Sequence, residues 1–278
     1  MDRVEKETPS KDQYNATLVG RTEITPQLQI LKVAPDVKNF EFSAGQFTVL
    51  GLTWSSPSLP ETKRKEYSEE KSKRLIRRAY SISSGSRWQE YLEFYISLVT
   101  SGELTPRLFQ LAVGDRLFIG PKGKGVFTID RVSAEKNIVM VATGTGLAPY
   151  ISMVRSMALE DSSRTITILH GASYSWDLGY RAELESLDRK CAAFNYIPII
   201  TRPDEDKSWT GRVGRLNDWI AKPELAEICK VPMDGEKSEF FLCGHPEMVT
   251  GCAEILTKKG FFEGSKKEPG TLHLEKYW

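Results

Sequence analysis

Short runs of alternating apolar and polar residues fill the first part of the chain. These runs predict strands at 17–24, 29–33, 47–52 and 92–98. Proline, glycine and asparagine separate the runs, and many short strands at such spacing are typical of a closed antiparallel barrel. The pattern therefore predicts an antiparallel β-barrel in the first part of the chain.

A different pattern begins at residue 137. Apolar runs at 138–142, 166–169, 196–200 and 240–242 are each followed by a segment of helical period. Strands that alternate with helices predict a parallel α/β sheet. The polar segment 130–136 separates the two patterns. The predicted organisation is a tail at 1–13, a barrel domain at 14–132 and an α/β domain at 133–278.

A glycine-rich turn lies at the start of the predicted α/β domain. Thr143-Gly144-Thr145-Gly146 falls between the predicted strand 137–142 and a predicted helix at 147–159, in which Pro149 suits an early position. Glycines there let backbone amides approach an anion, and the helix N-terminus favours a pyrophosphate. The alternative is a tight turn that only packs strand on helix.

Two arginines follow later strands of the same domain. Arg202 comes after the strand 196–200, and Arg212 lies in Thr210-Gly211-Arg212. Guanidinium groups suit phosphate monoesters. Each alone is more often a surface arginine, but two at the carboxyl ends of successive units favour one shared anionic ligand.

Composition and charge exclude several classes of function. The 278 residues are 40% hydrophobic, enough for two cores, and 38 basic residues nearly balance 37 acidic ones. No global field therefore favours nucleic acid or an anionic membrane. No run approaches the roughly 20 apolar residues of a membrane span, and the first 13 residues lack the apolar core of a signal peptide, so a cytoplasmic location is expected.

The cysteines and histidines give no metal-binding pattern. The four cysteines, Cys191, Cys229, Cys243 and Cys252, have neither the C-x-x-C pairs nor the close spacing of iron–sulfur or structural zinc sites. They are expected to be reduced thiols. The three histidines lie far apart in sequence and are expected to be structural. No metal is predicted.

An ordered set of motifs carries a family resemblance. In chain order these motifs are Gly45-Gln46-Phe47-Thr48, Arg78-Ala79-Tyr80-Ser81, Leu92-Glu93-Phe94-Tyr95, Gly102-Glu103-Leu104-Thr105-Pro106-Arg107-Leu108, Ala142-Thr143-Gly144-Thr145-Gly146, Asp177-Leu178-Gly179-Tyr180, Thr210-Gly211-Arg212, Cys243-Gly244-His245-Pro246-Glu247-Met248-Val249 and Tyr277-Trp278. The chain resembles bacterial ferredoxin/flavodoxin–NADP reductases, of the ferredoxin reductase-like superfamily, from about residue 14 to 278. The resemblance implies an FAD-binding barrel domain, an NADP(H)-binding α/β domain and a C-terminal tail that covers the flavin.

The resemblance also implies roles for particular residues. FAD would be bound by Arg78, Ala79, Tyr80, Ser81, Ile96, Ser97, Leu98, Val99, Glu103, Leu104, Thr105, Thr145, Tyr277 and Trp278. Arg78 would meet its pyrophosphate, Tyr80 would lie against the isoalloxazine, and Ser81 would lie near N5. The residue types agree, because a guanidinium binds phosphate, a phenol ring stacks and a hydroxyl donates to a ring nitrogen.

The implied NADP(H) site lies in the second domain. Its residues would be Gly144, Gly146, Ala172, Ser173, Thr201, Arg202, Arg212, Cys243 and Gly244. The implied catalytic residues are Ser81, Cys243, Glu275 and Tyr80, with Cys243 beside the nicotinamide and Glu275 near the flavin. A small core hydrophobe is the alternative interpretation of Cys243.

Two departures from the family pattern change the expectations. Ser173 stands where many relatives carry an arginine that grips the 2′-phosphate of NADPH, so one phosphate contact is missing. The segment 54–74, absent from compact relatives, carries prolines and charge runs and predicts an exposed, partly mobile loop. It is a solvated insertion with no role, a basic docking surface for an acidic redox partner, or a segment that touches the FAD adenine.

The expected activity is FAD-mediated electron transfer between NADPH and ferredoxin or flavodoxin, by a monomer. One alternative is an NADH-dependent reductase that serves an oxygenase or a small-molecule acceptor. A second is a flavin-bound, redox-sensing interaction protein with little turnover. The preferred nicotinamide and the rate of flavin reduction would distinguish the three.

Overall fold

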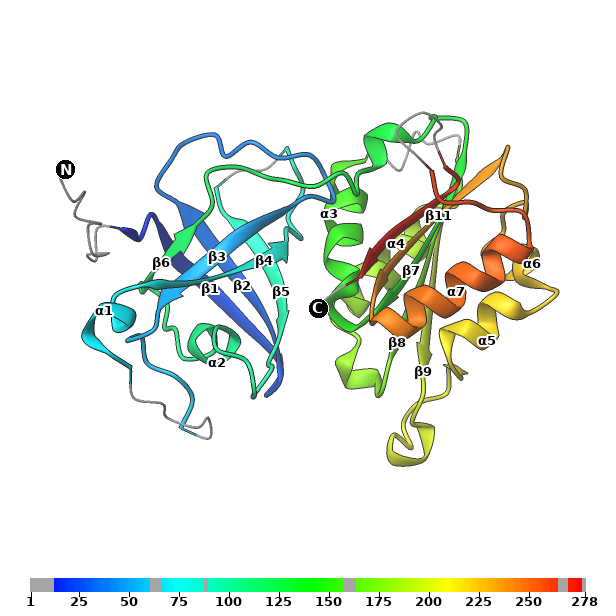
Figure 1. The fold of residues 1–278 in the computed structure, drawn as a ribbon. Helices are drawn as coiled ribbons and strands as arrows, with labels where there is room; N and C mark the ends of the chain where they lie inside the picture. The colour runs from blue at the N-terminus through cyan, green and yellow to red at the C-terminus, as the bar shows by residue number, and fades with distance from the viewer. Residues whose placement is uncertain (1–12, 61–66, 88–89, 158–163, 265–269, 277–278) are drawn as a thin grey trace. The chain divides into compact units, whose positions relative to one another are not determined.

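The chain divides into two compact units between Val126 and Phe127. The computed structural model describes residues 13–60, 67–87, 90–157, 164–264 and 270–276, shown in colour in Figure 1. The division lies just before the polar segment 130–136. The predicted boundary, after residue 132, lies within that segment.

The first unit is built on a six-stranded sheet in the order β4-β3-β6-β1-β2-β5. Its strands are β1 (Ala16–Thr25), β2 (Leu28–Pro35), β3 (Phe47–Thr53), β4 (Leu75–Ser81), β5 (Leu92–Ser97) and β6 (Arg116–Ile119), and its helices are α1 (Glu69–Ser72) and α2 (Thr105–Leu108). Every strand pair in the sheet is antiparallel. A bridge between Ile82 and Phe94 brings the end of β4 beside β5. The predicted antiparallel barrel is confirmed.

Alternation along these strands fills the barrel with aliphatic and aromatic side chains. Leu18, Leu31, Leu50, Phe94 and Leu117 are all fully buried in one core cluster. Burial of such side chains contributes roughly 1.5–3 kcal/mol each. This core fixes the strands whose ends carry the predicted flavin residues.

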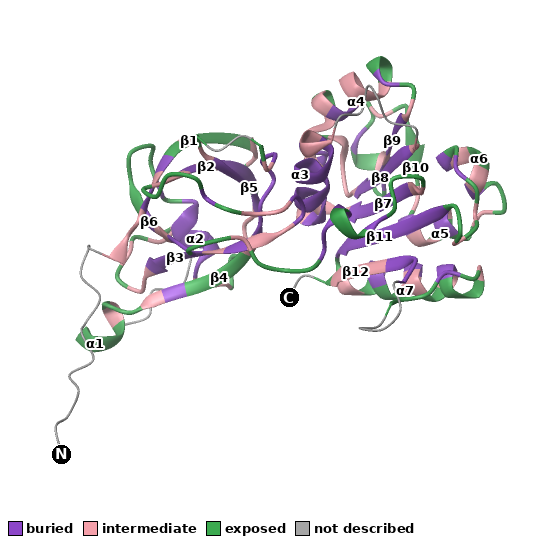
Figure 2. Ribbon diagram, turned by 90° about the horizontal axis from the view of Figure 1, so that it is seen from above, coloured by how far each residue is buried: buried purple, intermediate pink, exposed green. Residues whose placement is uncertain are grey.

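The second unit is a six-stranded sheet in the order β10-β9-β8-β7-β11-β12, in which every neighbouring pair is parallel. Its strands are β7 (Asn137–Thr143), β8 (Ile166–Ala172), β9 (Phe194–Ile200), β10 (Arg212–Val213), β11 (Ser238–Gly244) and β12 (Leu272–Lys276). Its helices are α3 (Ala148–Ser156), α4 (Arg181–Lys190), α5 (Leu216–Ala221), α6 (Leu225–Cys229) and α7 (Pro246–Lys258). Helices α3 and α4 cover one face of the sheet, and α5 and α7 cover the other (Figures 1 and 2).

The central strands of this sheet are buried on both faces, as the purple of β7, β8 and β11 in Figure 2 shows. Continuous apolar runs are typical of such strands. Because all six strands are parallel, their carboxyl ends meet at one edge. The predicted parallel α/β sheet is confirmed.

The glycine-rich turn differs from its prediction in one respect. Residues Gly144–Leu147 form a 3₁₀ turn, and the α-helix begins only at Ala148 with Pro149 in its first turn. The helix ends at Ser156, although the pattern predicts helix to residue 159; residues 158 and 159 lie outside the described residues.

The described part of the segment 54–74 is more ordered than the prediction of an exposed loop. Its side chains Trp54 and Leu59 pack against the barrel core. Ser68 caps α1, and its hydroxyl accepts from the Lys71 amide at 3.3 Å. The apolar residues of this segment therefore anchor it to the barrel.

No helix of the described residues is long and apolar enough to cross a membrane.

Candidate functional site

Strand β4 presents the predicted Arg/Tyr/Ser group at the edge of the barrel. Arg78 is exposed, and its Nη1 donates to the Arg77 carbonyl at 2.8 Å. Ala79 is exposed, Tyr80 packs against the barrel core, and Ser81 is buried. Burial raises the pKa of Tyr80 well above its ordinary value, although the Arg78 charge opposes that shift. Tyr80 therefore stays a neutral phenol beside a cation.

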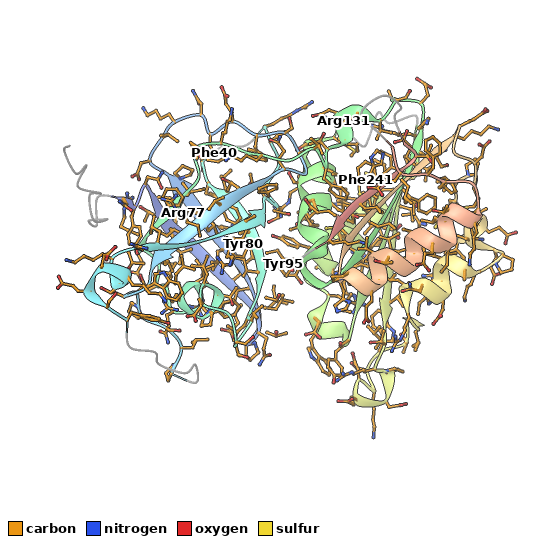
Figure 3. All side chains as sticks on the ribbon, viewed as in Figure 1. Phe40, Arg77, Tyr80, Tyr95, Arg131 and Phe241 are labelled. Atoms are coloured by element: carbon orange, nitrogen blue, oxygen red, sulfur yellow. The ribbon has the colours of Figure 1, made fainter. Side chains whose placement is uncertain are left out.

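The bridge between β4 and β5 brings two groups of predicted flavin residues together. The Ser83 amide, two residues after Ser81, donates to the Glu93 carbonyl at 2.8 Å. Figure 3 marks Tyr80 on β4 and Tyr95 on β5. Ile96 is buried, whereas Ser97, Leu98 and Val99 are partly exposed where β5 ends.

A compact turn follows β5, and we call residues 99–108 the 99–108 turn. The Thr105 hydroxyl accepts from the Val99 amide at 3.0 Å and donates to the Val99 carbonyl at 3.1 Å. The Gly102 amide donates to the same carbonyl at 2.9 Å. A Cβ on Gly102 would lie 3.0 Å from that oxygen, so a larger residue would open the turn. The backbone of Val99, predicted to contact flavin, here shapes the turn.

Arg107 is the buried charge of the 99–108 turn. Its Nη1 donates to the Glu103 carbonyl and lies 3.5 Å from the Glu103 carboxylate. Only 8% of the Arg107 side chain is exposed, and its Nε has no hydrogen-bond partner within the described part of the chain. The turn thus keeps a buried donor beside Glu103, Leu104 and Thr105, which the family resemblance assigns to FAD binding.

The glycine turn of the second unit is held by backbone contact with the end of β11. A Cβ on Gly146 would lie 2.4 Å from the Cys243 carbonyl oxygen, so only glycine fits there. Gly244 has φ of +131°, and the His245 amide that follows donates to the Thr143 hydroxyl at 2.9 Å. A Cβ on Gly144 would meet nothing within 4 Å. The turn is packed on one side and open at Gly144, as a pyrophosphate site requires.

The predicted phosphate residues lie at the carboxyl ends of β8 and β9 and at the start of β10. The Thr201 amide donates to the Ala172 carbonyl, and the Arg202 amide donates to the Ser173 carbonyl, both at 3.0 Å. Arg212 begins β10 and pairs with Ile199. The side chains of Arg202 and Arg212 are exposed at this edge.

Sequence reasoning missed the aromatic residues that surround these arginines. The rings of Tyr174 and Trp176 stack with centroids 4.7 Å apart. The Tyr174 hydroxyl accepts from Arg202 Nη1 at 3.0 Å and donates to a Glu205 carboxylate oxygen at 2.7 Å. The only available signal was that these aromatic and acidic residues directly follow the strands.

Cys243 and Glu275 are register partners on β11 and β12. The Cys243 thiol is fully buried and donates to a Glu275 carboxylate oxygen at 3.6 Å. The structure thus pairs two of the predicted catalytic residues. The predicted flavin cover, Tyr277 and Trp278, lies outside the described residues, and Thr145 lies on the 3₁₀ turn of the second unit.

The histidines have structural partners. His170 is fully buried with Nδ1 3.0 Å from the Tyr196 hydroxyl, and burial lowers its pKa to about 3. His245 Nδ1 accepts from the Glu247 amide at the start of α7, and His273 Nε2 lies 2.7 Å from a Glu239 carboxylate oxygen. All four cysteines are buried, and none of them forms a disulfide within the described residues. Across the described ranges, no group of three or more His, Cys, Asp or Glu side chains could hold a metal ion.

Comparison with known proteins gives a family for this chain. Residues 140–254 match the family described as the oxidoreductase NAD-binding domain. A flavodoxin/ferredoxin–NADP reductase of Buchnera aphidicola is 30% identical over 239 residues, which cover 85% of this chain and 88% of the relative. The enzyme of that name from Escherichia coli is 31% identical with the same coverage.

Solved structures agree in fold. A ferredoxin NADP⁺ reductase from Neisseria gonorrhoeae, solved with FAD and NADP bound, superposes with a TM-score of 0.79 at 22% identity and covers 95% of this chain and 98% of its own. On the strength of the sequence matches, which span nearly the whole chain, the chain belongs to the flavodoxin/ferredoxin–NADP reductase family.

Proposed function

We propose that this protein uses FAD to transfer electrons between NADPH and a one-electron carrier, ferredoxin or flavodoxin. The observation that carries the proposal is the carboxyl edge of the second sheet. There the open Gly144 turn, two exposed arginines and the Cys243–Glu275 pair lie at the ends of neighbouring parallel strands. Ligands bind at such edges in open α/β sheets.

The first unit supplies the FAD site in this proposal. Arg78 offers a guanidinium to the pyrophosphate, Tyr80 offers an uncharged ring face, and the Ser81 hydroxyl donates toward the isoalloxazine. The 99–108 turn contributes the remaining phosphate contacts. When bound, FAD accepts a hydride and releases electrons singly, which couples a two-electron donor to a one-electron acceptor.

The second unit binds and orients NADPH. Gly144 and Gly146 place backbone amides near the pyrophosphate, and Arg202 and Arg212 bind the 2′-phosphate. Cys243 and Glu275 orient the nicotinamide ring, because the Glu275 carboxylate accepts the thiol hydrogen and so holds the sulfur in one position. Burial of the thiol keeps water away from this position.

A preference for NADPH over NADH is expected to be modest. Ser173 brings no positive charge. Arg202 already donates a hydrogen bond to the Tyr174 hydroxyl, which in turn donates to Glu205. The Glu205 carboxylate also places negative charge near the 2′-phosphate. These observations favour NADH use as the second candidate, as in a reductase that serves an oxygenase.

Ferredoxin or flavodoxin as the carrier follows from the family. The described part of the segment 54–74 does not favour a basic docking surface, because Lys73 pairs with Glu69 at 2.7 Å and Arg74 pairs with Glu70. The monomeric state and the cytoplasmic location stay predictions.

The experiment that tests the proposal is reduction of purified ferredoxin and flavodoxin by NADPH in the presence of the FAD-loaded protein. We expect turnover with at least one of these carriers. Cys243→Ala should lower the rate of hydride transfer much more than the affinity for NADPH. Failure with both carriers, combined with rapid reduction of a small-molecule acceptor by NADH, would favour the second candidate.

A further inference from the structure

The segment 54–74 connects β3 to β4, and its two ends continue the hairpin that these strands form (Figure 1). The Trp54 amide donates to the Arg74 carbonyl at 3.1 Å, and the Ser55 amide donates to the Ser72 carbonyl at 3.0 Å. The hairpin is therefore complete at residues 54 and 74. A short turn would suffice to close it, so the additional residues need another explanation.

Three side chains of the segment form one cluster, which we call the Trp54–Tyr67–Lys71 cluster. The Trp54 and Tyr67 rings meet edge to face with centroids 4.8 Å apart. Lys71 Nζ lies 4.4 Å from the Trp54 ring centroid and 4.9 Å from that of Tyr67. These contacts hold the Tyr67 ring against Trp54, and Trp54 itself packs on the barrel core.

The cluster bonds directly to the 99–108 turn. The Tyr67 hydroxyl donates to a Glu103 carboxylate oxygen at 3.1 Å, and Arg107 Nη2 donates to the Trp54 carbonyl at 3.0 Å. The Leu59 amide donates to the Pro106 carbonyl at 3.3 Å. Three hydrogen bonds thus connect the segment 54–74 to three residues of the turn, Glu103, Pro106 and Arg107.

These bonds act on a buried charge. The guanidinium of Arg107 is almost wholly buried, and its partners are Glu103 and the Trp54 carbonyl. Hydrogen bonds from neighbouring groups help to hold a buried ion pair in one geometry. The Tyr67 hydroxyl and the Trp54 carbonyl supply such bonds and therefore restrict the Glu103–Arg107 pair to one arrangement.

We propose that the Trp54–Tyr67–Lys71 cluster positions the 99–108 turn for FAD, so that the segment 54–74 is a built-in support for flavin binding. The inference rests on the proposed function, because it takes the turn to bind the FAD phosphates. Tyr67 is a positioning residue: it acts on FAD through Glu103. Both a solvated insertion and a partner-docking surface predict that flavin retention is independent of Tyr67.

The test is the rate of FAD release from the holoprotein after dilution, followed by the rise in flavin fluorescence. Tyr67→Phe removes only the hydroxyl and should speed release by about three- to tenfold, the net effect of one hydrogen bond of ordinary strength. Tyr91→Phe is the matched control, because the Tyr91 hydroxyl accepts from Lys32 Nζ at 3.3 Å in the same unit and makes no hydrogen bond with the turn within the described part of the chain. This control should release FAD at the wild-type rate.

A second variant replaces residues 55–73 with Asn-Gly, which closes the hairpin between Trp54 and Arg74. It should release FAD faster than Tyr67→Phe does, because all contacts of the cluster with the turn except the Trp54 carbonyl are lost. Unchanged release in both variants, or equal acceleration in Tyr91→Phe, would overturn the inference and leave the proposed function intact. A wild-type protein that binds no FAD would overturn both.

Discussion

Side-chain hydrogen bonds are prominent in the 99–108 turn of the first unit, whereas close backbone packing is prominent in the glycine turn at 143–147 of the second unit. In the first turn, the Thr105 and Arg107 side chains make bonds whose partners include a residue of a separate segment. In the second, Gly146 lies against the Cys243 carbonyl with no room for a Cβ. Both turns are proposed to face phosphates.

The two turns should therefore respond differently to substitution. Side-chain bonds can be changed one at a time, so the affinity of the first turn can vary in small steps. A glycine contact between two backbones either fits or does not. We therefore expect graded effects on FAD in the first unit and abrupt effects on folding in the second.

The largest expected effect comes from Gly146→Ala. Its Cβ would overlap the Cys243 carbonyl. Because the overlapping atoms belong to the backbone, they cannot move aside as a flexible side chain could, and the free energy of unfolding should fall by about 3 kcal/mol. Urea denaturation measures this change. Gly144→Ala is the matched control: its Cβ meets open space, and its positive φ should cost only about 1–2 kcal/mol.

The same pair of variants separates stability from binding. The Cβ of Gly144→Ala would stand where the pyrophosphate is proposed to bind, so this variant should lose affinity for NADPH despite its smaller loss of stability. Equal losses of stability in the two variants would contradict the backbone contact as the feature that holds the turn.

Thr105→Val tests the side-chain-held turn. The variant leaves the Val99 amide without its acceptor, which should cost about 1–3 kcal/mol in the free energy of unfolding and speed FAD release. Thr167→Val is the control, because the buried Thr167 hydroxyl donates to the Cys229 carbonyl at 2.6 Å in the second unit. Thermal unfolding and flavin fluorescence should show similar destabilisation in both, with faster FAD release in Thr105→Val alone.

Ser173→Arg should sharpen the choice of nucleotide at the second edge. An added guanidinium beside Arg202 would bind the 2′-phosphate, and we expect the ratio of kcat/KM for NADPH over NADH to rise about tenfold. Steady-state kinetics with both nucleotides measures this ratio. The FAD release rate is the internal control, and a rise in both affinities alike would argue against a 2′-phosphate contact.

The smallest expected effect concerns the stability of the folded state at acid pH. It involves Glu239, near the amino-terminal end of β11 in the second sheet. Burial alone would raise the pKa of Glu239, but its bonds with His273 at 2.7 Å and Lys136 at 3.0 Å outweigh burial and lower the pKa below 4.5. Glu239 therefore stabilises the folded state above pH 4.5, and this contribution is lost as the pH falls through the lowered pKa.

Glu239→Gln should accordingly remove part of the acid sensitivity. Its free energy of unfolding, measured by urea denaturation between neutral pH and acid, should fall less steeply below about pH 4.5 than that of the wild type. Parallel curves for the two proteins would show that Glu239 does not contribute.

Local patterns were sufficient to predict much of this structure. The strands, the glycine turn and the two arginines at the carboxyl edge follow from periodicity and from residue chemistry, which involve neighbours in sequence, whereas Cys243 and Glu275 were named only by the family resemblance. The support of the 99–108 turn could not be predicted in this way, because Arg107 meets Trp54 across 53 positions and Tyr67 meets Glu103 across 36. Charge runs made the segment 54–74 resemble a solvated loop and concealed its two aromatic anchors.

The Tyr174–Glu205 pair was missed for the same reason. Tyr174 and Glu205 are 31 positions apart and meet only because β8 and β9 are neighbours in the parallel sheet. Family resemblance named Arg202 and Ser173 but not the residues that engage the arginine.

The most direct test of the account is anaerobic rapid mixing of the FAD-loaded protein with NADPH and, in parallel, with NADH, while the visible absorbance of the flavin is followed. We expect rapid bleaching by NADPH and slower bleaching by NADH. Bleaching by NADH at an equal or greater rate would contradict the NADPH assignment, and no bleaching by either nucleotide would contradict the reductase function itself.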